Sequence, residues 1–268
     1  MHTATTSRQQ NAGTTSYVPN KETGNMNSTL ALARAEIRRL GRNKRYSIFS
    51  VGLPVVLYLV IAPTVKHYNV YGVAYAAYYM IAMASIGAFS GALTGNAQRI
   101  SQERKDGWVR QLRLTALPAN AYVIGKIIVS MAITVPSIAI VLLLGRFYGN
   151  VHMEPWKWFA VGGTIWLGSL TFTALAVAIG YRFMPDTVQP IAMFAYFVMS
   201  ILGGLWFALS GFLEKIGNVL PTYQITRIGT DLISNHSVPA TAYLTILAWF
   251  AAFVALAVLA VRGTRETV

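Results

Sequence analysis

The chain has 268 residues, of which 54% are hydrophobic and only 12% are charged, and its mean hydropathy is +0.48. A soluble domain carries about 25% charged residues, so this composition indicates an integral membrane protein. The formal net charge of +13 does not point to a nucleic-acid partner, because the basic residues cluster between apolar runs. The lack of cysteine excludes disulfides, thiolate metal sites and a cysteine nucleophile.

Two segments precede the first apolar run. Residues 1–27 are rich in Ser, Thr, Asn, Gln and Gly and contain no apolar core of a signal peptide, so we expect a disordered tail. Residues 28–45 place apolar side chains on one helical face and four arginines on another: Arg34, Arg38, Arg42 and Arg45. This periodicity predicts an amphipathic helix in the membrane interface. A plain basic anchor beside the membrane is the alternative.

Six apolar runs are long enough to cross a bilayer. They cover residues 46–65, 73–97, 122–144, 157–181, 187–209 and 240–261, within a membrane domain of residues 46–262 that is followed by a short tail, 263–268. No Asp, Glu, Lys or Arg lies near the centre of any run. Ion-coupled carriers usually need such a group in the membrane, so the pattern disfavours a secondary transporter.

Residues 211–239 are too polar to span a membrane, yet apolar residues recur through them and Pro221 divides them. We expect two short amphipathic helices that dip into one membrane surface. Of the 22 Lys and Arg residues, 17 lie in the N-terminal arm, in the polar segment up to Lys126, at Arg182 and in the C-terminal tail. The positive-inside rule therefore predicts that both termini and this polar segment are cytoplasmic, and that residues 211–239 lie outside.

The polar segment, residues 96–126, interrupts the apolar chain with basic residues interleaved with Glu103, Asp106, Trp108, Leu112 and Leu114. This pattern predicts docking onto a partner, although a basic surface facing anionic lipid is the alternative. The chain lacks a GxxxxGK[ST] phosphate loop, and none of its histidines has a partner at metal-ligand spacing. Any energy for uphill transport must therefore come from a partner.

Two stretches carry a family resemblance: SQERKDGWVRQLRLTALPANAYVIGKI, residues 101–127, and LWFALSGFLEKIGNVLPTYQITRIG, residues 205–229. Both resemble segments of the ABC-2 type transporter permeases, above all the six-span permeases of bacterial drug and antibiotic exporters. Ala116 departs from the proline that the family often has there. The resemblance implies an all-α integral membrane fold with six transmembrane helices. It also implies an elbow helix at 28–45, a cytoplasmic coupling helix within 98–121 and an external re-entrant segment at 211–239.

The resemblance further implies two copies of a separate ABC ATPase subunit, which would carry the ATP and magnesium, and a second copy of the permease, with a homodimer favoured. This chain itself would hold no cofactor and would not be an enzyme. The residues that would contact the ATPase are Glu103, Arg104, Asp106, Gly107, Trp108, Arg110, Leu112 and Arg113. Glu103 would also pair with Arg38 or Arg42 of the elbow helix.

A substrate path between spans two and five is a further implication of the resemblance. Its candidate lining residues are Met83, Phe89, Met193, Phe194 and Phe197, although such side chains also commonly face lipid or neighbouring helices. The expected function is the permease subunit of an exporter in the bacterial cytoplasmic membrane, with an amphipathic drug, antibiotic, peptide or lipid-like cargo. A membrane scaffold or signalling partner and a lipid-modifying membrane enzyme are the alternatives.

Overall fold

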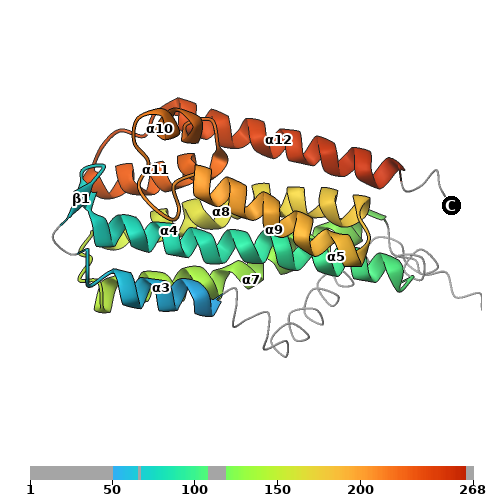
Figure 1. Ribbon diagram of the computed structural model, residues 1–268, viewed down its shortest axis with the longest axis horizontal. Helices are drawn as coiled ribbons and strands as arrows, with labels where there is room; N and C mark the ends of the chain where they lie inside the picture. Colours follow the sequence, from blue (N-terminus) through green and yellow to red (C-terminus); the bar gives the residue numbers. More distant parts are fainter. Residues whose placement is uncertain (1–50, 66–67, 108–118, 264–268) are drawn as a thin grey trace, which may run out of the picture.

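The computed structural model describes residues 51–65, 68–107 and 119–263, which form an elongated bundle of helices (Figure 1). The helices are α3 (Leu53–Ile61), α4 (Tyr75–Ser90), α5 (Asn96–Lys105), α7 (Ala119–Phe147), α8 (Pro155–Arg182), α9 (Pro185–Leu202), α10 (Phe212–Gly217), α11 (Pro221–Ser234) and α12 (Ala240–Gly263). A π-helical turn, η2 (Gly91–Gly95), joins α4 to α5. Strands β1 (Asn69–Val70) and β2 (Val73–Ala74) form a short antiparallel hairpin before α4.

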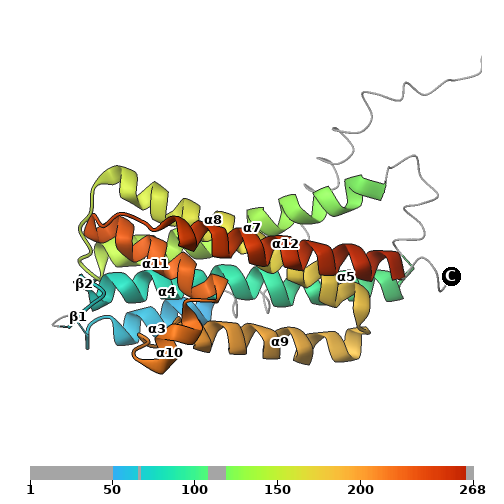
Figure 2. The same ribbon diagram turned by 90° about the horizontal axis from the view of Figure 1, so that it is seen from above.

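The centre of the bundle is the continuous 31-residue helix Tyr75–Lys105, made of α4, η2 and α5. In the apolar section of this helix, 94% of the residues are buried inside the protein, whereas in the apolar section of α12 only 6% are buried. Small residues let neighbouring helices approach α4 closely, and Phe89 stacks on Phe172 of α8 with ring centroids 4.3 Å apart. Figure 2 shows α7 and α9 on opposite sides of this central helix.

Within the described residues, four helices are long and apolar enough to cross a membrane: Tyr75–Lys105, Ile124–Phe147, Pro155–Arg182 and Ala240–Gly263. They confirm the second, third, fourth and sixth predicted spans. Of the first predicted span, α3 covers nine residues, and the positions before residue 51 lie outside the described residues. The fifth appears as α9, which has 18 residues and contains Asp186 and Pro190. The six-span prediction is therefore confirmed for four helices.

The fifth predicted span ends earlier than the sequence indicated, at Leu202 instead of residue 209. Gly203 follows, and Gly204 has φ +74°, a left-handed conformation that glycine adopts without strain. Two carbonyl oxygens of this non-helical stretch accept hydrogen bonds from tyrosine hydroxyls. Tyr78 of α4 donates to the Gly204 carbonyl, and Tyr71, which precedes α4, donates to the Leu209 carbonyl. These bonds satisfy backbone groups that a helix would have paired internally.

The two helices expected in residues 211–239 are present as α10 and α11, and Pro221, which was expected to divide them, opens α11. Proline is well tolerated in the first turn of a helix, where its missing N–H has no intrahelical partner anyway. One face of α11 is buried: Ile225 and Ile228 have almost no exposed surface. Ile225 packs against Gly168 of α8, where any side chain would collide with it.

The predicted loop of residues 98–121 is largely helical at its two ends, which corrects the sequence-based boundaries. The central helix continues to Lys105, and α7 already begins at Ala119. Ala97, Ile100 and Ser101 are buried against neighbouring helices, so α5 is held by packing despite its polar sequence. Residues 108–118 lie outside the described residues.

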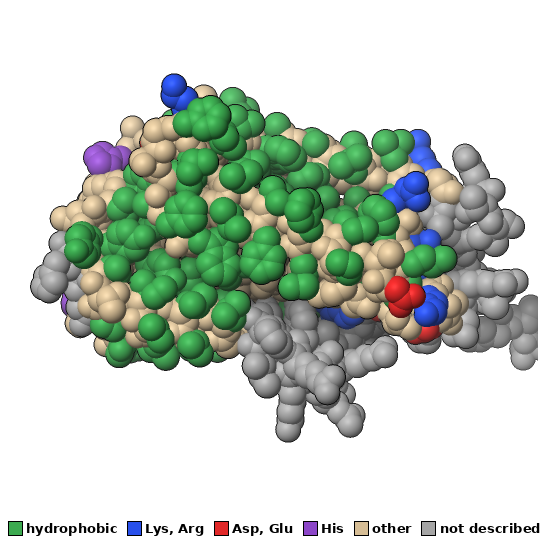
Figure 3. Space-filling view, viewed as in Figure 1, with side chains coloured by type: hydrophobic (Ala, Val, Ile, Leu, Met, Phe, Trp, Pro, Cys, Tyr) green, Lys and Arg blue, Asp and Glu red, His purple; other side chains and the backbone are tan. Residues whose placement is uncertain are grey.

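The two ends of the bundle differ in the elements and side chains that they carry (Figure 3). Apolar side chains cover much of the face in Figure 3, and acidic and basic side chains gather at the end where α5 and α12 terminate. Basic residues occupy the last turns of α5, α8 and α12 at this end, which we call the α5 end. The opposite end carries the β1–β2 hairpin and α10 and is called the hairpin end (Figure 1).

Candidate functional site

The α5 end is built around the contact of α5 with α8. The Ser101 hydroxyl donates to the Phe183 carbonyl at 2.8 Å, and an Arg104 guanidinium nitrogen donates to the Gly180 carbonyl at 2.9 Å. The same guanidinium lies 5.4 Å from the centre of the Tyr181 ring, a cation–π distance. Arg104 is therefore fixed to α8 by its head group.

Gly180 allows this close approach of the two helices. A Cβ atom at Gly180 would lie 2.9 Å from the carbonyl oxygen of Ala97 and 2.9 Å from Cβ of Ile100. Such distances are essentially never found for real Cβ atoms, so a larger residue would push α5 away from α8.

An ion pair joins α5 to α7. Nζ of Lys126 lies 2.6 Å from Oε1 of Glu103, and the two side chains are only 3% and 17% exposed. A charged group with so little access to water needs a close partner, because its desolvation costs several kcal/mol. Removal of one partner of a buried ion pair is destabilising by on the order of 3 to 5 kcal/mol. The pair therefore ties α5 to α7 firmly.

A buried hydrogen-bond chain connects the same three helices deeper in the bundle. Nδ2 of Asn96 donates to Oγ of Ser130 in α7 at 2.7 Å, and that oxygen lies 2.6 Å from Oγ1 of Thr173 in α8. All three side chains are at most 2% exposed. Arg99 extends the chain by donating to Oδ1 of Asn96 at 2.5 Å. Fully bonded polar groups in a low-dielectric interior stiffen the structure around them.

The helix ends immediately beyond these contacts. Nε2 of Gln102 donates to Oδ1 of Asp106 at 2.9 Å, and Gly107 adopts φ +71°. A glycine in the left-handed conformation is a common helix terminator. A Cβ atom at Gly107 would meet nothing within 4 Å among the described residues, so its role here is conformational.

Comparison with known proteins identifies the family. Residues 60–261, three quarters of the chain, match the family described as "ABC-2 family transporter protein". The chain belongs to the ABC-2 family of transporter proteins. It is also 27% identical over 225 residues to the protein named "Putative transport permease YvfS" of Bacillus subtilis (strain 168), a match that covers 83% of this chain and 92% of that protein. The resemblance inferred from sequence is confirmed, and the chain is a multi-pass membrane protein of this family.

The structure of this ABC-2 protein gathers several predicted coupling residues at the α5 end. Glu103, Arg104, Asp106 and Gly107 all lie in the last turn of α5 or directly after it. The other members of the predicted set, and the two arginines expected to pair with Glu103, lie outside the described residues: Trp108, Arg110, Leu112, Arg113, Arg38 and Arg42. Their roles stay predictions.

The sequence did not single out most of the residues that anchor α5 to its neighbours. The sequence pattern places Lys126 only at the end of the polar segment, and no pattern distinguishes Ser101, Ser130 or Thr173. For these anchoring residues, the usable signal in the sequence was Lys126 itself, because a lysine inside a predicted membrane span needs a partner. Hydroxyl residues carry no comparable signal, since they can bond their own helix backbone.

The five candidates for a substrate path fall into two groups. Met83 and Phe89 have no exposed surface and belong to the core around α4, so in this structure they do not face an open path. Met193, Phe194 and Phe197 lie on α9 and are 41%, 72% and 38% exposed. Of the five candidates, therefore, only the three on α9 are exposed.

Proposed function

We propose that this ABC-2 protein is the transport subunit of an ATP-driven exporter. A separate ABC ATPase subunit would bind the segment of residues 98–121 and hydrolyse ATP there. The complex would contain two ATPase subunits and two copies of the permease in the bacterial cytoplasmic membrane, with both termini of each permease in the cytoplasm. Family membership supports a transport role, and the sequence, which lacks a GxxxxGK[ST] loop, supports an external source of energy.

The rigid attachment of α5 to α7 and α8 carries this proposal. The Glu103–Lys126 ion pair, the Arg104–Gly180 hydrogen bond and the Asn96–Ser130–Thr173 chain hold one end of the central helix to both neighbours. Coupling between distant sites is transmitted by packed, rigid elements and hydrogen-bond networks. A partner that displaces the residues after Lys105 would therefore move the central helix together with α7 and α8.

The surface of α9 supports an amphipathic cargo that passes between two copies of the chain. Met193, Phe194 and Phe197 form an exposed apolar face, and Phe197 stacks on Trp206 with ring centroids 6.1 Å apart. Methionine and aromatic side chains adapt to apolar ligands of varied shape. A drug, antibiotic, peptide or lipid-like molecule fits this chemistry.

A pull-down from native membranes tests the partner. Tagged wild-type protein should recover an ATPase subunit, and the recovered complex should hydrolyse ATP. Trp108→Ala should weaken the interaction by removing an aromatic anchor, and Arg110→Glu should weaken it by reversing a charge. Lys215→Glu is the matched control, because Lys215 lies in exposed α10 at the hairpin end and should leave recovery unchanged.

Three results would contradict the proposal. Recovery of the permease without any ATPase would remove the energy source, and equal recovery with Arg110→Glu and Lys215→Glu would place the contact elsewhere. A complex that hydrolyses ATP without stimulation by any amphipathic compound, and moves none across a vesicle membrane, would favour a scaffold role.

A further inference from the structure

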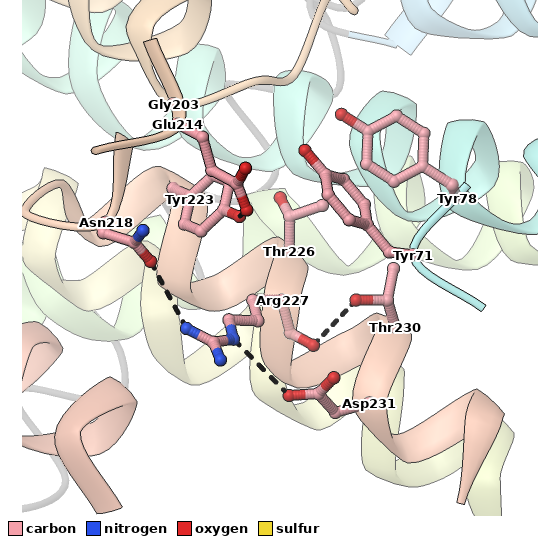
Figure 4. A pocket seen from close by; sticks show the side chains of 10 residues that line it. All are labelled: Tyr71, Tyr78, Gly203, Glu214, Asn218, Tyr223, Thr226, Arg227, Thr230 and Asp231. Atoms are coloured by element: carbon pink, nitrogen blue, oxygen red, sulfur yellow. Dashed lines mark hydrogen bonds and ion pairs between the residues drawn. The ribbon is translucent and has the colours of Figure 1, made fainter. Parts of the chain in front are cut away.

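A polar cavity of about 350 Å³ lies at the hairpin end, far from the contacts of α5 (Figure 4). Its walls come from the turn between β1 and β2, from the first turn of α4, and from α10 and α11. Three tyrosines and three charged side chains dominate the lining: Tyr71, Tyr78, Tyr223, Glu214, Arg227 and Asp231. Neither the family match nor the proposed transport function assigns a role to this cavity.

The three tyrosine rings form an aromatic wall. Tyr71 makes an edge contact with Tyr78, with ring centroids 5.7 Å apart and an angle of 61°, and with Tyr223 at 6.4 Å and 88°. Their hydroxyl groups are engaged, because Tyr71 donates to the Leu209 carbonyl, Tyr78 to the Gly204 carbonyl and Tyr223 to Oε1 of Glu214. These bonds hold the rings at steep angles to one another around the cavity.

The charges in the cavity do not balance. Arg227 is occupied by its neighbours: it donates to Oδ1 of Asn218 at 3.3 Å, and its Nε lies 3.7 Å from Oδ2 of Asp231. Glu214 accepts a hydrogen bond from Tyr223 at 3.1 Å, and among the described residues no lysine or arginine forms an ion pair with it. Two carboxylates and one guanidinium leave an excess negative charge beside the aromatic wall.

We propose that this cavity binds an organic ammonium group, with Glu214 as its counter-ion and the rings of Tyr71, Tyr78 and Tyr223 around it. Aromatic faces combined with a carboxylate are the usual environment for a quaternary or primary ammonium ligand. The cavity admits a group of the size of choline. The ammonium can belong to a soluble amine or to a phospholipid headgroup. The site is independent of whether the protein uses ATP.

Binding of choline to the purified full-length protein tests the proposal. The protein is placed in nanodiscs of phosphatidylglycerol, which has no amine, and titrated calorimetrically with choline and with 3,3-dimethyl-1-butanol, its neutral carbon isostere. The ammonium site should bind choline more tightly by roughly tenfold, as expected for a cation–π and charge contribution of this kind. Equal affinity for the two compounds, or no binding of choline, would overturn the proposal without the need for any variant.

Two variants locate the site. Glu214→Gln keeps an acceptor for the Tyr223 hydroxyl but removes the charge, so choline affinity should fall by roughly tenfold. Glu154→Gln is the matched control, because Glu154 is 60% exposed outside the cavity and should not change the affinity. Unchanged choline binding by Glu214→Gln would also overturn the proposal.

The same titration in nanodiscs that contain phosphatidylethanolamine distinguishes the two sources of the ammonium. A weaker apparent affinity for choline would show that the lipid headgroup competes for the cavity. An unchanged affinity would assign the site to a soluble amine. Both results support an ammonium site.

Discussion

Glu103 and Lys126 join α5 to α7 at a position where neither charge has much contact with water. Glu103→Gln should lower the stability by about 3 kcal/mol, because it leaves the ammonium of Lys126 buried without this carboxylate. The double variant Glu103→Gln/Lys126→Met removes both charges and should be less destabilised than Glu103→Gln alone. Thermal unfolding of the purified proteins in detergent measures this difference.

The exposed Lys215→Met is the control for the loss of a lysine and should unfold at the wild-type temperature. If the effects of Glu103→Gln and of Lys126→Met, each measured alone, simply add in the double variant, the pair does not hold α5 to α7.

Asp231 in α11 predicts a dependence of stability on pH. Desolvation by burial raises the pKa of its carboxyl group above the usual 3.8, and the charges of Arg227 and His236 only partly oppose this shift. The folded protein therefore binds this proton more tightly than the unfolded chain does. The contribution of Asp231 to stability is complete below pH 3.8 and is lost as the pH rises through the raised pKa.

Asp231→Asn removes this titration. Its melting temperature relative to wild type should therefore increase with rising pH across that interval, and a series of melting curves at different pH values measures it. A difference that stays constant with pH would show that the carboxyl group has the same pKa in the folded and unfolded chain.

At the level of whole elements, Gly203 allows α11 to pack closely against the end of α9. A Cβ atom at this position would lie 1.8 Å from Oγ1 of Thr222 and 2.5 Å from the Met199 carbonyl oxygen. Thr222 itself donates to that carbonyl at 2.7 Å and so connects α11 to the end of α9. Gly203→Ala should separate the two helices and cost about 2 kcal/mol or more.

Gly163→Ala is the matched control for this substitution. Gly163 lies within α8, and a Cβ atom there would meet nothing within 4 Å among the described residues. Alanine favours a helix over glycine by about 1 kcal/mol, so this variant should be as stable as wild type or slightly more stable. Melting temperatures that are equal for the two variants would contradict the close packing at Gly203.

The boundaries of α5 and α9 show how far sequence patterns predict elements. Polar residues after position 95 indicated a loop, but the helix continues because Asn96 bonds to Ser130 of α7 and Ser101 bonds to Phe183, directly after α8. Apolar residues up to 209 indicated a continuous span, but the chain leaves the helix at Gly203 because tyrosine hydroxyls bind its carbonyls. In both places contacts between distant residues override the local pattern.

For the whole molecule, the distribution of Lys and Arg predicts the orientation in the membrane. The chain contains no cysteine, so single cysteines can be introduced without background labelling. Lys215→Cys in exposed α10 should react with a membrane-impermeant maleimide in intact cells, whereas Asp106→Cys after α5 should react only after permeabilisation. Reaction of both positions, or of Asp106→Cys alone, in intact cells would contradict the predicted topology.

The sequence alone was sufficient for the class of fold, the family, four spanning helices and the two short helices before α12. These features follow from apolar length, from periodicity and from proline positions, which are properties of neighbouring residues. Only the tertiary structure brought Lys126 to Glu103, withdrew Met83 and Phe89 into the core, and closed three tyrosines and Glu214 around one cavity. Each of these depends on the packing of helices far apart in the chain, which sets distances that no local pattern encodes.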